Sequence, residues 1–250
     1  MLEVNNEDQE EEVKINSRDI YQFIDENKFR EIVKKFCNSY IPVLKNVENT
    51  FFKNKIDPVL ALFSMFLNDL NYNSWVSSEK IRQLGKSLEN YNGDFQQELL
   101  RNMNGWKKME ILDAVNHEKK IIADVKNKQY TEKGDKKISS YDSIKACLNK
   151  KKYKGYTGYY LAMIKNVKRS LDIPFTPPDN KTKKNRPHRE DIRIIDGFAF
   201  YGKITGDKNF LYKVYKELPN VLSSLLNKED LKNQIIEDER YESFFKKTFD

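Results

Sequence analysis

Two short apolar segments near the middle of the chain most constrain its fold: MEILDAV (residues 109–115) and KIIADVK (residues 120–126). Both are rich in aliphatic side chains, and the polar stretch NHEK separates them, which predicts a β-hairpin. Asp113, Asp124 and Lys126 interrupt the apolar runs. Because burying an unpaired charge costs several kcal/mol, packing alone does not account for charges in such strands. The pattern therefore predicts a functional site built on a sheet.

The predicted hairpin brings these three charged side chains together. Asp124 and Lys126 are two residues apart, so they lie on one face of their strand. If the hairpin turns through Asn116 to Lys119, Asp113 lies near the same face on the partner strand. One alternative at this point is a plain ion pair between Asp124 and Lys126 on an edge strand.

Two carboxylates and a lysine also match the needs of phosphodiester hydrolysis. Proteins hold Mg²⁺ with one or two carboxylates, and water and phosphate oxygens complete its shell. The metal stabilises charge on the phosphate and lowers the pKa of a bound water. The backbone carbonyl of Val125 is a candidate further ligand. Lys126 either orients or deprotonates the water, or stabilises the transition-state oxygens, and the spacing does not choose between these roles.

The chain before the hairpin has the periodicity of helices. Residues 17–104 carry apolar side chains at three- and four-residue spacing, and Asp57 followed by Pro58 indicates a helix start. A later helix is predicted to begin at Ser77 or Ser78. Residues 1–16 are acidic and lack core-forming periodicity, so we expect a flexible lead-in. We expect the helical region to pack on the sheet.

Strand and helix patterns alternate after the hairpin. Residues 139–148 have helical spacing, and TGYYLAMI at 157–164 is typical of a buried strand. The predicted fold class is therefore α/β (α+β), with a mixed central sheet flanked by helices and a helical N-terminal region. We expect this core to cover residues 105–227.

The end of the core and the C-terminus have a different character. Residues 174–193 contain four prolines and a cluster of lysines, which predicts a long loop. Asp207 is expected to cap a helix that runs through Leu218. Residues 228–250 are highly charged, and we expect a tail there that carries at most one surface helix.

Positive charge is concentrated in one stretch of the chain. Residues 119–193 contain 21 Lys and Arg against 8 Asp and Glu, whereas the whole chain has a net charge of only +7. Such a block suits the neutralisation of nucleic-acid phosphates. A solvated lysine-rich surface would give the same charge, so charge alone does not decide.

Within this block, two groups of residues are candidates for DNA contact. Arginine binds guanine through two hydrogen bonds in the major groove, so Arg186, Arg189 and Arg193 in the long loop are candidate base readers. The alternative is a loop that touches only phosphates. The residues after the second hairpin strand are candidate phosphate contacts, with a solvated turn as the alternative: Lys128, Thr131 and Lys133.

Several other classes of protein are disfavoured. No GxxxxGK[ST] or GxGxxG motif occurs, so nothing indicates a nucleotide-driven activity. Two cysteines and two separated histidines provide neither a disulfide framework nor a zinc site. No apolar run approaches the roughly 20 residues that cross a bilayer, and the acidic start is unlike a signal peptide. We expect a cytoplasmic protein without a membrane partner.

The spacing of the three charged residues also resembles a known superfamily. The layout D-x₁₀-D-x-K from Asp113 to Lys126 resembles the PD-(D/E)XK nucleases, although Leu112 stands where the superfamily name has proline. The continuation ADVKNKQYTEKG resembles, in its KNK, Thr131 and Gly134, the type II restriction endonucleases related to SinI that cut GGNCC or GGWCC sites.

A second segment carries the same resemblance. IRIIDGFAFYGKITGDKNFLYKVYKELP at 192–219 resembles the C-terminal block of that family in its IDG, FY and TG elements. The likeness covers about Phe95 to Pro219, and the N-terminal helices agree only in general pattern.

The resemblance implies a PD-(D/E)XK restriction-endonuclease-like core and double-strand cleavage of DNA. It implies Mg²⁺ as the cofactor, with Mn²⁺ as an expected substitute. It also implies a homodimer that acts on a near-palindromic site, and a companion cytosine methyltransferase without stable contact. Glu98 lies on the preceding helical segment, where some of these nucleases place an additional metal-binding glutamate.

Two alternatives remain open at this stage. The first is a repair or junction-resolving nuclease with the same catalytic centre. The second is a basic, non-catalytic nucleic-acid-binding module in which Asp124 and Lys126 form a structural pair. Incubating the protein and DNA with Mg²⁺ or EDTA distinguishes an enzyme from a binding module.

Overall fold

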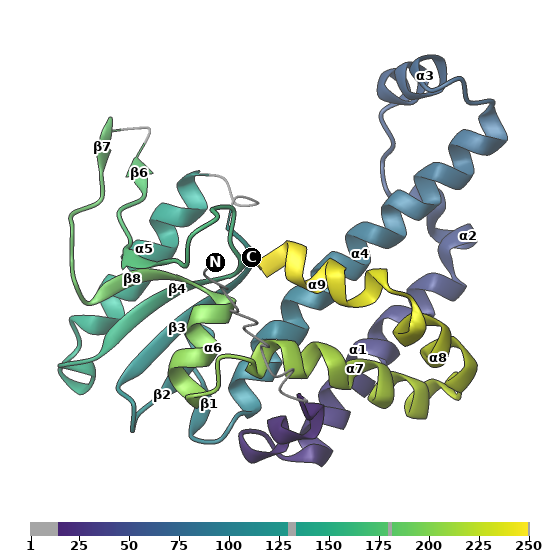
Figure 1. Cartoon of the computed structure of the whole chain (residues 1–250). Helices are drawn as coiled ribbons and strands as arrows, with labels where there is room; N and C mark the ends of the chain where they lie inside the picture. Colours follow the sequence, from purple (N-terminus) through teal and green to yellow (C-terminus); the bar gives the residue numbers. More distant parts are fainter. Residues whose placement is uncertain (1–14, 130–133, 180–181, 250) are drawn as a thin grey trace, which may run out of the picture.

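The computed structural model describes residues 15–129, 134–179 and 182–249. Its centre is a six-stranded mixed sheet in the order β1-β2-β3-β4-β8-β5, and a separate two-stranded ribbon pairs β6 with β7. The long helices extend from one end of this sheet (Figure 1). The strands are β1 (Trp106–Lys108), β2 (Ala114–Asn116), β3 (Ile121–Lys128), β4 (Thr157–Ile164), β5 (Asp172–Pro174), β6 (Pro178–Asp179), β7 (Lys184–Asn185) and β8 (Ile192–Asp196).

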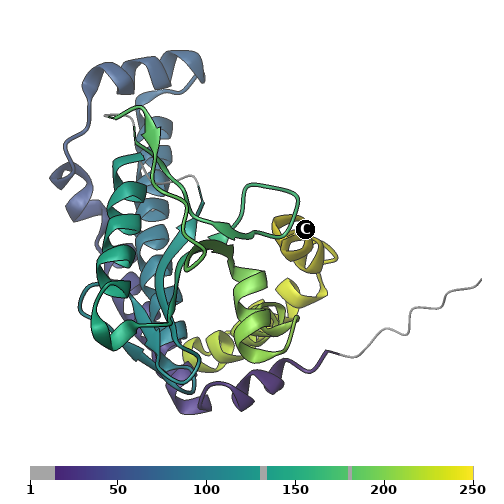
Figure 2. The ribbon, with the colours of Figure 1, turned by 90° about the vertical axis from the view of Figure 1, so that its left-hand side faces the viewer.

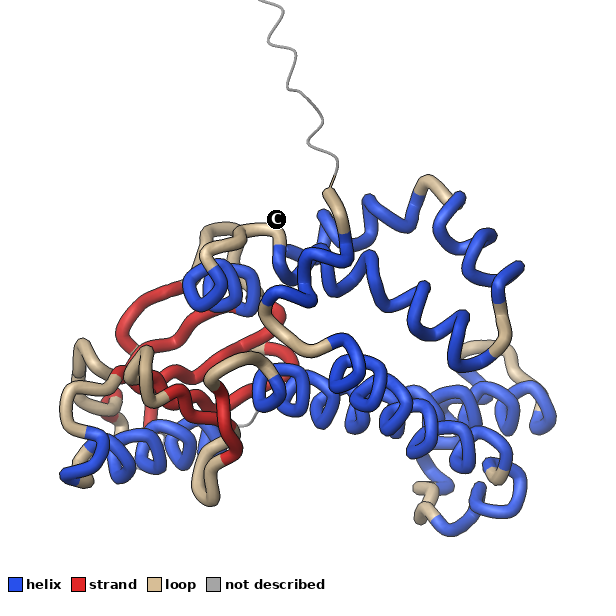
Figure 3. The backbone as a smooth tube through the Cα atoms, turned by 90° about the horizontal axis from the view of Figure 1, so that it is seen from below, coloured by secondary structure: helices blue, strands red, loops and turns tan. Residues whose placement is uncertain are grey.

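Helices account for most of the remaining structure, and Figure 3 shows them filling the end of the molecule away from the strands. The α-helices are α1 (Glu26–Lys45), α2 (Val47–Thr50), α3 (Pro58–Leu67), α4 (Tyr72–Asn102), α5 (Gly134–Leu148), α6 (Gly197–Thr205), α7 (Phe210–Leu226), α8 (Glu229–Glu237) and α9 (Arg240–Phe249). Short 3-10 helices occur at Ser17–Gln22, Phe51–Lys53 and Lys151–Tyr153.

The sheet confirms the predicted mixed α/β fold. Strands β1, β2 and β3 pair antiparallel, β3, β4 and β8 pair parallel, and β5 closes the far edge antiparallel to β8. Parallel neighbours need a crossover connection, and α5 supplies it between β3 and β4. The predicted buried strand at 157–164 is confirmed as β4.

Both faces of the sheet are covered, which explains why its central strands are apolar. Along β3, Ala123 and Val125 face one core, which α1, α4, α6 and α7 complete, whereas Ile122 faces a second core beneath α5. Alternate side chains of a strand point to opposite faces. Asp124 and Lys126 therefore share the face of Ile122, on the α5 side.

The helical N-terminal region is confirmed, with one correction. Asp57 caps α3 as expected, because its Oδ1 accepts a hydrogen bond from the Val59 N–H. The predicted helix start at Ser77 or Ser78 is wrong. Asn71 caps α4 by accepting from the Ser74 N–H at 2.9 Å, and the helix continues for 31 residues. The expected flexibility of residues 1–14 concerns a segment outside the described residues.

Local predictions around the sheet also need correction. The first hairpin strand is shorter than MEILDAV, because residues 110–113 form bends and Asp113 immediately precedes β2. The segment 174–193 is not one loop: it contains the β6–β7 ribbon, and Arg193 belongs to β8. Ile192 and Ile195 are buried, and this apolar content makes β8 a central strand.

The C-terminal segment is also more structured than expected. Instead of a charged tail, residues 229–249 form α8 and α9, and α9 packs on α7. Tyr241 and Phe245, four residues apart on α9, are buried, and the ring of Tyr241 stacks on that of Tyr215 with 4.7 Å between the ring centroids.

Helix α7 begins at Phe210 rather than at a cap on Asp207, whose Oδ1 instead accepts from the Asn209 N–H. Among the described residues, no helix is long and apolar enough to cross a membrane.

Candidate active site

The β2–β3 pairing sets two carboxylates side by side. In this register Ala114 is opposite Ala123, and the Asp113 N–H donates to the Ala123 carbonyl at 3.0 Å. Continuing the register by one residue places Asp113 opposite Asp124. Directly opposed residues on antiparallel strands are side-chain neighbours. The two acidic residues therefore meet beside the middle of β3, just past the end of its pairing with β2, as the hairpin pattern predicts.

Asp113 is held in place by hydrogen bonds to all of its oxygens. Its Oδ2 accepts from the Val125 N–H at 2.7 Å, and its Oδ1 accepts from Arg101 Nη2 at 3.0 Å. Arg101 Nε also donates to the Asp113 backbone carbonyl at 2.8 Å. Arg101 is not among the site residues predicted from the sequence. The only signal for it is an arginine that directly follows Leu99 and Leu100, in the last turn of an amphipathic helix.

The pKa of Asp113 reflects its crowded and buried position. Burial raises this pKa from 3.8 to about 6, and the charge and hydrogen bonding of the Asp124 carboxyl add to the rise. The Val125 N–H and the charge of Lys126 act in the opposite direction. A raised pKa is expected for a carboxyl group that lies next to a second one, and such a pair is typical of a position where both groups bind the same positive charge.

Lys126 lies beside this pair. Its Nζ donates to Asp124 Oδ1 at 2.9 Å, and the two side chains are 24% and 10% exposed. An ion pair would explain this contact alone, although β3 lies between β2 and β4 and is not an edge strand. An ion pair does not explain the second carboxylate, that of Asp113, which is mostly buried and directly next to Asp124.

The donor set fits a magnesium ion. A strand residue directs its N–H and C=O to the same side. The Val125 N–H reaches Asp113 on the β2 side of β3, so the Val125 carbonyl points to the β2 side as well. This carbonyl lies beyond Ala114, where the pairing between β2 and β3 ends. Within residues 15–129, 134–179 and 182–249, no three Asp, Glu, His or Cys side chains form a metal-binding group. Two carboxylates and one carbonyl suit Mg²⁺, which keeps several waters and uses few protein ligands.

Glu98 contacts this pair only through Arg101. Its Oε1 accepts from Arg101 Nη1 at 3.1 Å and lies 3.8 Å from Lys35 Nζ on α1. Arg101 therefore stands between Glu98 and Asp113. In this arrangement Glu98 orients the arginine, and its role as a further metal ligand stays a prediction.

The residues predicted to follow the active strand are described only in part. Lys128 is the last residue of β3, and its Nζ donates to Glu89 Oε1 on α4 at 3.3 Å. Thr131 and Lys133 lie outside the described residues. The structure thus places Lys128 two residues beyond Lys126 along the same strand.

Arg186 anchors the β6–β7 ribbon to the core. Its guanidinium donates to Asp142 on α5 at 2.7 Å and to Asp179 on β6 at 3.2 Å. Nearby, the Tyr141 hydroxyl donates to the Pro187 carbonyl at 2.7 Å. These contacts fix the base of the ribbon against α5. The ribbon itself projects from the core (Figure 1).

Arg189 and Arg193 are also held by acidic side chains. Arg189 donates two hydrogen bonds to Asp191, at 2.8 and 2.6 Å, and holds the pKa of that carboxyl below its usual range. Arg193 donates to the Asp172 carboxylate at 2.6 Å and to its backbone carbonyl at 2.7 Å. The structure thus gives all three candidate base readers internal partners, and their contact with DNA stays a prediction.

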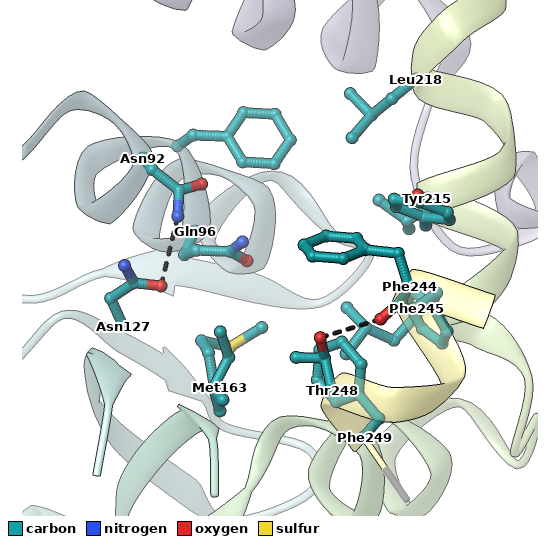
Figure 4. A pocket seen from close by; sticks show the side chains of 14 residues that line it. Asn92, Gln96, Asn127, Met163, Tyr215, Leu218, Phe244, Phe245, Thr248 and Phe249 are labelled. Atoms are coloured by element: carbon teal, nitrogen blue, oxygen red, sulfur yellow. Dashed lines mark hydrogen bonds between the residues drawn. The ribbon is translucent and has the colours of Figure 1, made fainter. Parts of the chain in front are cut away.

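A pocket lies on the opposite face of β3 (Figure 4). It has a volume of about 360 Å³ and is lined mostly by apolar side chains of α4, α7 and α9. Asn92 Nδ2 donates to Asn127 Oδ1 at 3.2 Å on its polar side. Asn127 alternates with Lys126, so this pocket opens away from the paired carboxylates. It is not the candidate active site.

Comparisons with known proteins cover both the helical region and the sheet. A sequence model of the Eco47II restriction endonuclease family matches residues 21–227. The type II restriction enzyme Eco47II of Escherichia coli is 34% identical over 185 residues, which cover 72% of this chain and 77% of that protein. The type II restriction enzyme Sau96I of Staphylococcus aureus is 26% identical over 207 residues, which cover 80% and 78%.

These matches confirm the resemblance to restriction endonucleases, while the narrower likeness to enzymes related to SinI stays a prediction. The family match includes Asp113, Asp124 and Lys126 and the arginine that holds the first of them. With more than half of its length matched, this chain belongs to the Eco47II restriction endonuclease family.

Proposed function

We propose that this protein is a Mg²⁺-dependent type II restriction endonuclease that cleaves both strands of DNA at a short GGNCC- or GGWCC-like site. The observation that carries the proposal is the opposition of Asp113 and Asp124 just past the end of the β2–β3 pairing, with Lys126 hydrogen-bonded to Asp124. The family and the two relatives named as type II restriction enzymes support the reaction class. The proposed DNA recognition sequence rests on the resemblance of residues 123–134 and 192–219 to the restriction endonucleases related to SinI.

In this proposal the carboxylates of Asp113 and Asp124 and the carbonyl of Val125 hold the ion. Mg²⁺, for which Mn²⁺ would substitute, supplies charge stabilisation at the phosphate and lowers the pKa of water. Arg101 and the Val125 N–H keep Asp113 turned toward Asp124. Lys126 Nζ, which donates a hydrogen bond to Asp124, lies at the same place, where it orients the attacking water or stabilises negative charge on the phosphate.

DNA contacts are proposed along the side of the molecule that carries the β6–β7 ribbon. A two-stranded ribbon fits the major groove. Lys183, with φ of 59°, and Lys184 lie at its turn. We propose that these lysines contact DNA together with the residues predicted from the sequence: Lys128, Thr131, Lys133, Arg186, Arg189 and Arg193. The internal ion pairs of the arginines would then exchange for contacts with bases or phosphates.

The biological setting follows from the same proposal. A two-fold DNA site is matched by a two-fold protein, so we propose a homodimer. A cytosine methyltransferase that protects the host sites is the proposed functional partner. The proposed location is the cytoplasm, where the DNA substrate is accessible.

The test compares the protein with Lys126→Ala on phage or plasmid DNA. We expect discrete fragments with Mg²⁺ and none with EDTA, and we expect Lys126→Ala to bind DNA but not cut it. Lys154→Ala is the matched control, because Lys154 is exposed near the opposite end of the sheet, just before β4. Sequencing the fragment ends identifies the recognition site.

Other outcomes of this test separate the alternatives. Cleavage of branched DNA without a fixed sequence would indicate a junction-resolving nuclease. Binding without cleavage under any metal would indicate a non-catalytic module, in which the 2.9 Å contact between Lys126 and Asp124 is a structural ion pair. Wild-type cleavage rates in both Asp124→Ala and Lys126→Ala would show that the catalytic site is elsewhere.

A further inference from the structure

The outer face of α3 is apolar and exposed to solvent. The helix has the sequence PVLALFSMFL, without a charged residue. Ala61 is its one buried residue and packs with Trp75 and Phe51 in a small separate core. Met65 is partly buried against this core, and the other large side chains of α3 are 54–80% exposed: Val59, Leu60, Leu62, Phe63, Phe66 and Leu67.

The position of α3 makes this face available to a partner. Helix α3 lies at the tip of an arm that the first part of α4 carries away from the sheet (Figure 1). The perpendicular view also places it at one extremity of the molecule, at the same end as the β6–β7 ribbon (Figure 2). The arm is thus directed to the side of the molecule where the ribbon projects.

The exposed apolar area is larger than a monomer usually carries. Phe52, Tyr72 and Ile81 lie on neighbouring segments of the arm and are 57–73% exposed. An aromatic side chain has about 150–250 Å² of surface, and four of these nine residues are aromatic and 57–80% exposed, so the nine together expose on the order of 800 Å². One partner buries a similar area in an interface of standard size. The largest apolar patch on a typical monomer is about 300–600 Å². We call these nine side chains the α3 patch.

The chemistry of the α3 patch selects the kind of partner. DNA binding requires positive charge, and α3 has none. The N-terminal segment MLEVNNEDQEEEVK is acidic and too poor in apolar residues to cover the patch. A second copy of α3 is complementary, because two uncharged apolar helices pack across a two-fold axis without repulsion between like charges.

We propose that the α3 patch is the dimerisation surface of this protein and that a second copy of the chain packs its own α3 patch against it. The need for two copies rests on the proposed function, because cutting both strands of DNA calls for two catalytic centres and each chain supplies one.

The first experiment measures mass in solution without DNA or metal. Sedimentation of the wild-type protein is expected to give twice the mass of one chain, and Phe66→Glu/Leu67→Glu is expected to give the mass of one chain. Both residues are exposed, so the melting temperature of the monomeric core should be retained. Phe244→Glu, at an exposed apolar residue of α9, is the matched control and should stay dimeric. A wild-type monomer, or a dimer that survives the double substitution, would overturn the proposal.

A disulfide test identifies the second copy as the occupant. Cys37 and Cys147 are both buried, so Leu67→Cys introduces an exposed thiol at the α3 patch. Mild oxidation is expected to join two chains through residue 67, and Ser224→Cys, on α7, is expected to stay unlinked. Absence of linkage at residue 67, both by oxidation and with a thiol-reactive cross-linker that spans a longer distance, would contradict a contact between two α3 helices.

Plasmid cleavage separates this proposal from the proposed function. The double glutamate variant is expected to yield nicked circles where the wild-type protein yields linear DNA. A dimer that does not cut DNA would leave the α3 interface standing and refute the nuclease proposal. A double glutamate variant that linearises DNA at the wild-type rate would refute the α3 interface alone.

Discussion

Arg101 and Asp113 are joined by two hydrogen bonds, one from Nε to the Asp113 backbone carbonyl at 2.8 Å and one from Nη2 to Oδ1 at 3.0 Å. One bond fixes the main chain and the other fixes the side chain. Asp113 lies outside the β2 ladder, so the strand alone does not orient its carboxylate. Arg101 therefore acts as a positioning residue for the proposed metal site.

Arg101→Ala is expected to lower the cleavage rate about 10–100-fold, the usual effect of removing a group that orients a metal ligand. The loss should be partly restored by raising the Mg²⁺ concentration, because the ligand is still present but less ordered. Titrating Mg²⁺ in a cleavage assay measures this. Arg82→Ala, which removes the ion pair between an exposed arginine and Glu79 on the same helix, should leave the Mg²⁺ dependence unchanged.

Mg²⁺ binding is expected to weaken as the pH falls through about 6. Asp113 binds a metal only when it is ionised, and its pKa is raised to about 6 by burial and by Asp124. Calorimetric titration with Mg²⁺ between pH 5 and pH 8 should show higher affinity and less proton release at the upper end. A pH-independent affinity would contradict Asp113 as a ligand.

Without metal, the same residue is expected to make the fold less stable as the pH rises from 4 to 6. The folded chain keeps a proton on Asp113 up to a pKa of about 6, whereas the unfolded chain loses it near 3.8. The unfolded state thus binds fewer protons in this window, so the free energy of unfolding falls as the pH rises through it. Denaturant unfolding in EDTA should show Asp113→Asn gaining stability over the wild type across this window. Parallel curves for the two proteins would disprove the effect.

Lys183→Ala and Lys184→Ala are expected to weaken DNA binding uniformly across sequences. Each change removes one proposed phosphate contact, so the slope of log affinity against log salt should decrease by about 1. Binding measured at several salt concentrations tests this, with unchanged unfolding curves as the control. If the weakening is confined to cognate DNA, these lysines read bases instead.

Phe245→Ala is expected to destabilise the protein by about 3–5 kcal/mol, as large cavities in a core do. Phe245 is buried on α9 and packs on the rings of Tyr212 and Tyr215. Phe244→Ala provides the control, because Phe244 is 67% exposed and should cost little. Similar urea midpoints for the two variants would show that α9 is not part of the folded core.

The local sequence determined the elements whose signals are short-range. The β-branched and aliphatic runs around Asp113 and Asp124 fixed the hairpin, and the eight residues of β4 were fully predicted. Asp57 and Pro58 defined the start of α3 for the same reason, because capping depends on neighbours along the chain. Two-residue alternation likewise placed Asp124 and Lys126 on one face.

Only the tertiary structure decided which distant groups act on these residues. Arg101 reaches Asp113 because α4 crosses the end of β2, a contact that no periodicity encodes. The loop arginine Arg186 gained partners on α5 and β6 by long-range packing. Tyr241 is buried although it lies in a charged segment, because α7 presents aromatic rings to it. Sequence spacing fixes the face on which a side chain lies, whereas its partner, its burial and hence its pKa depend on chain segments far away in the sequence.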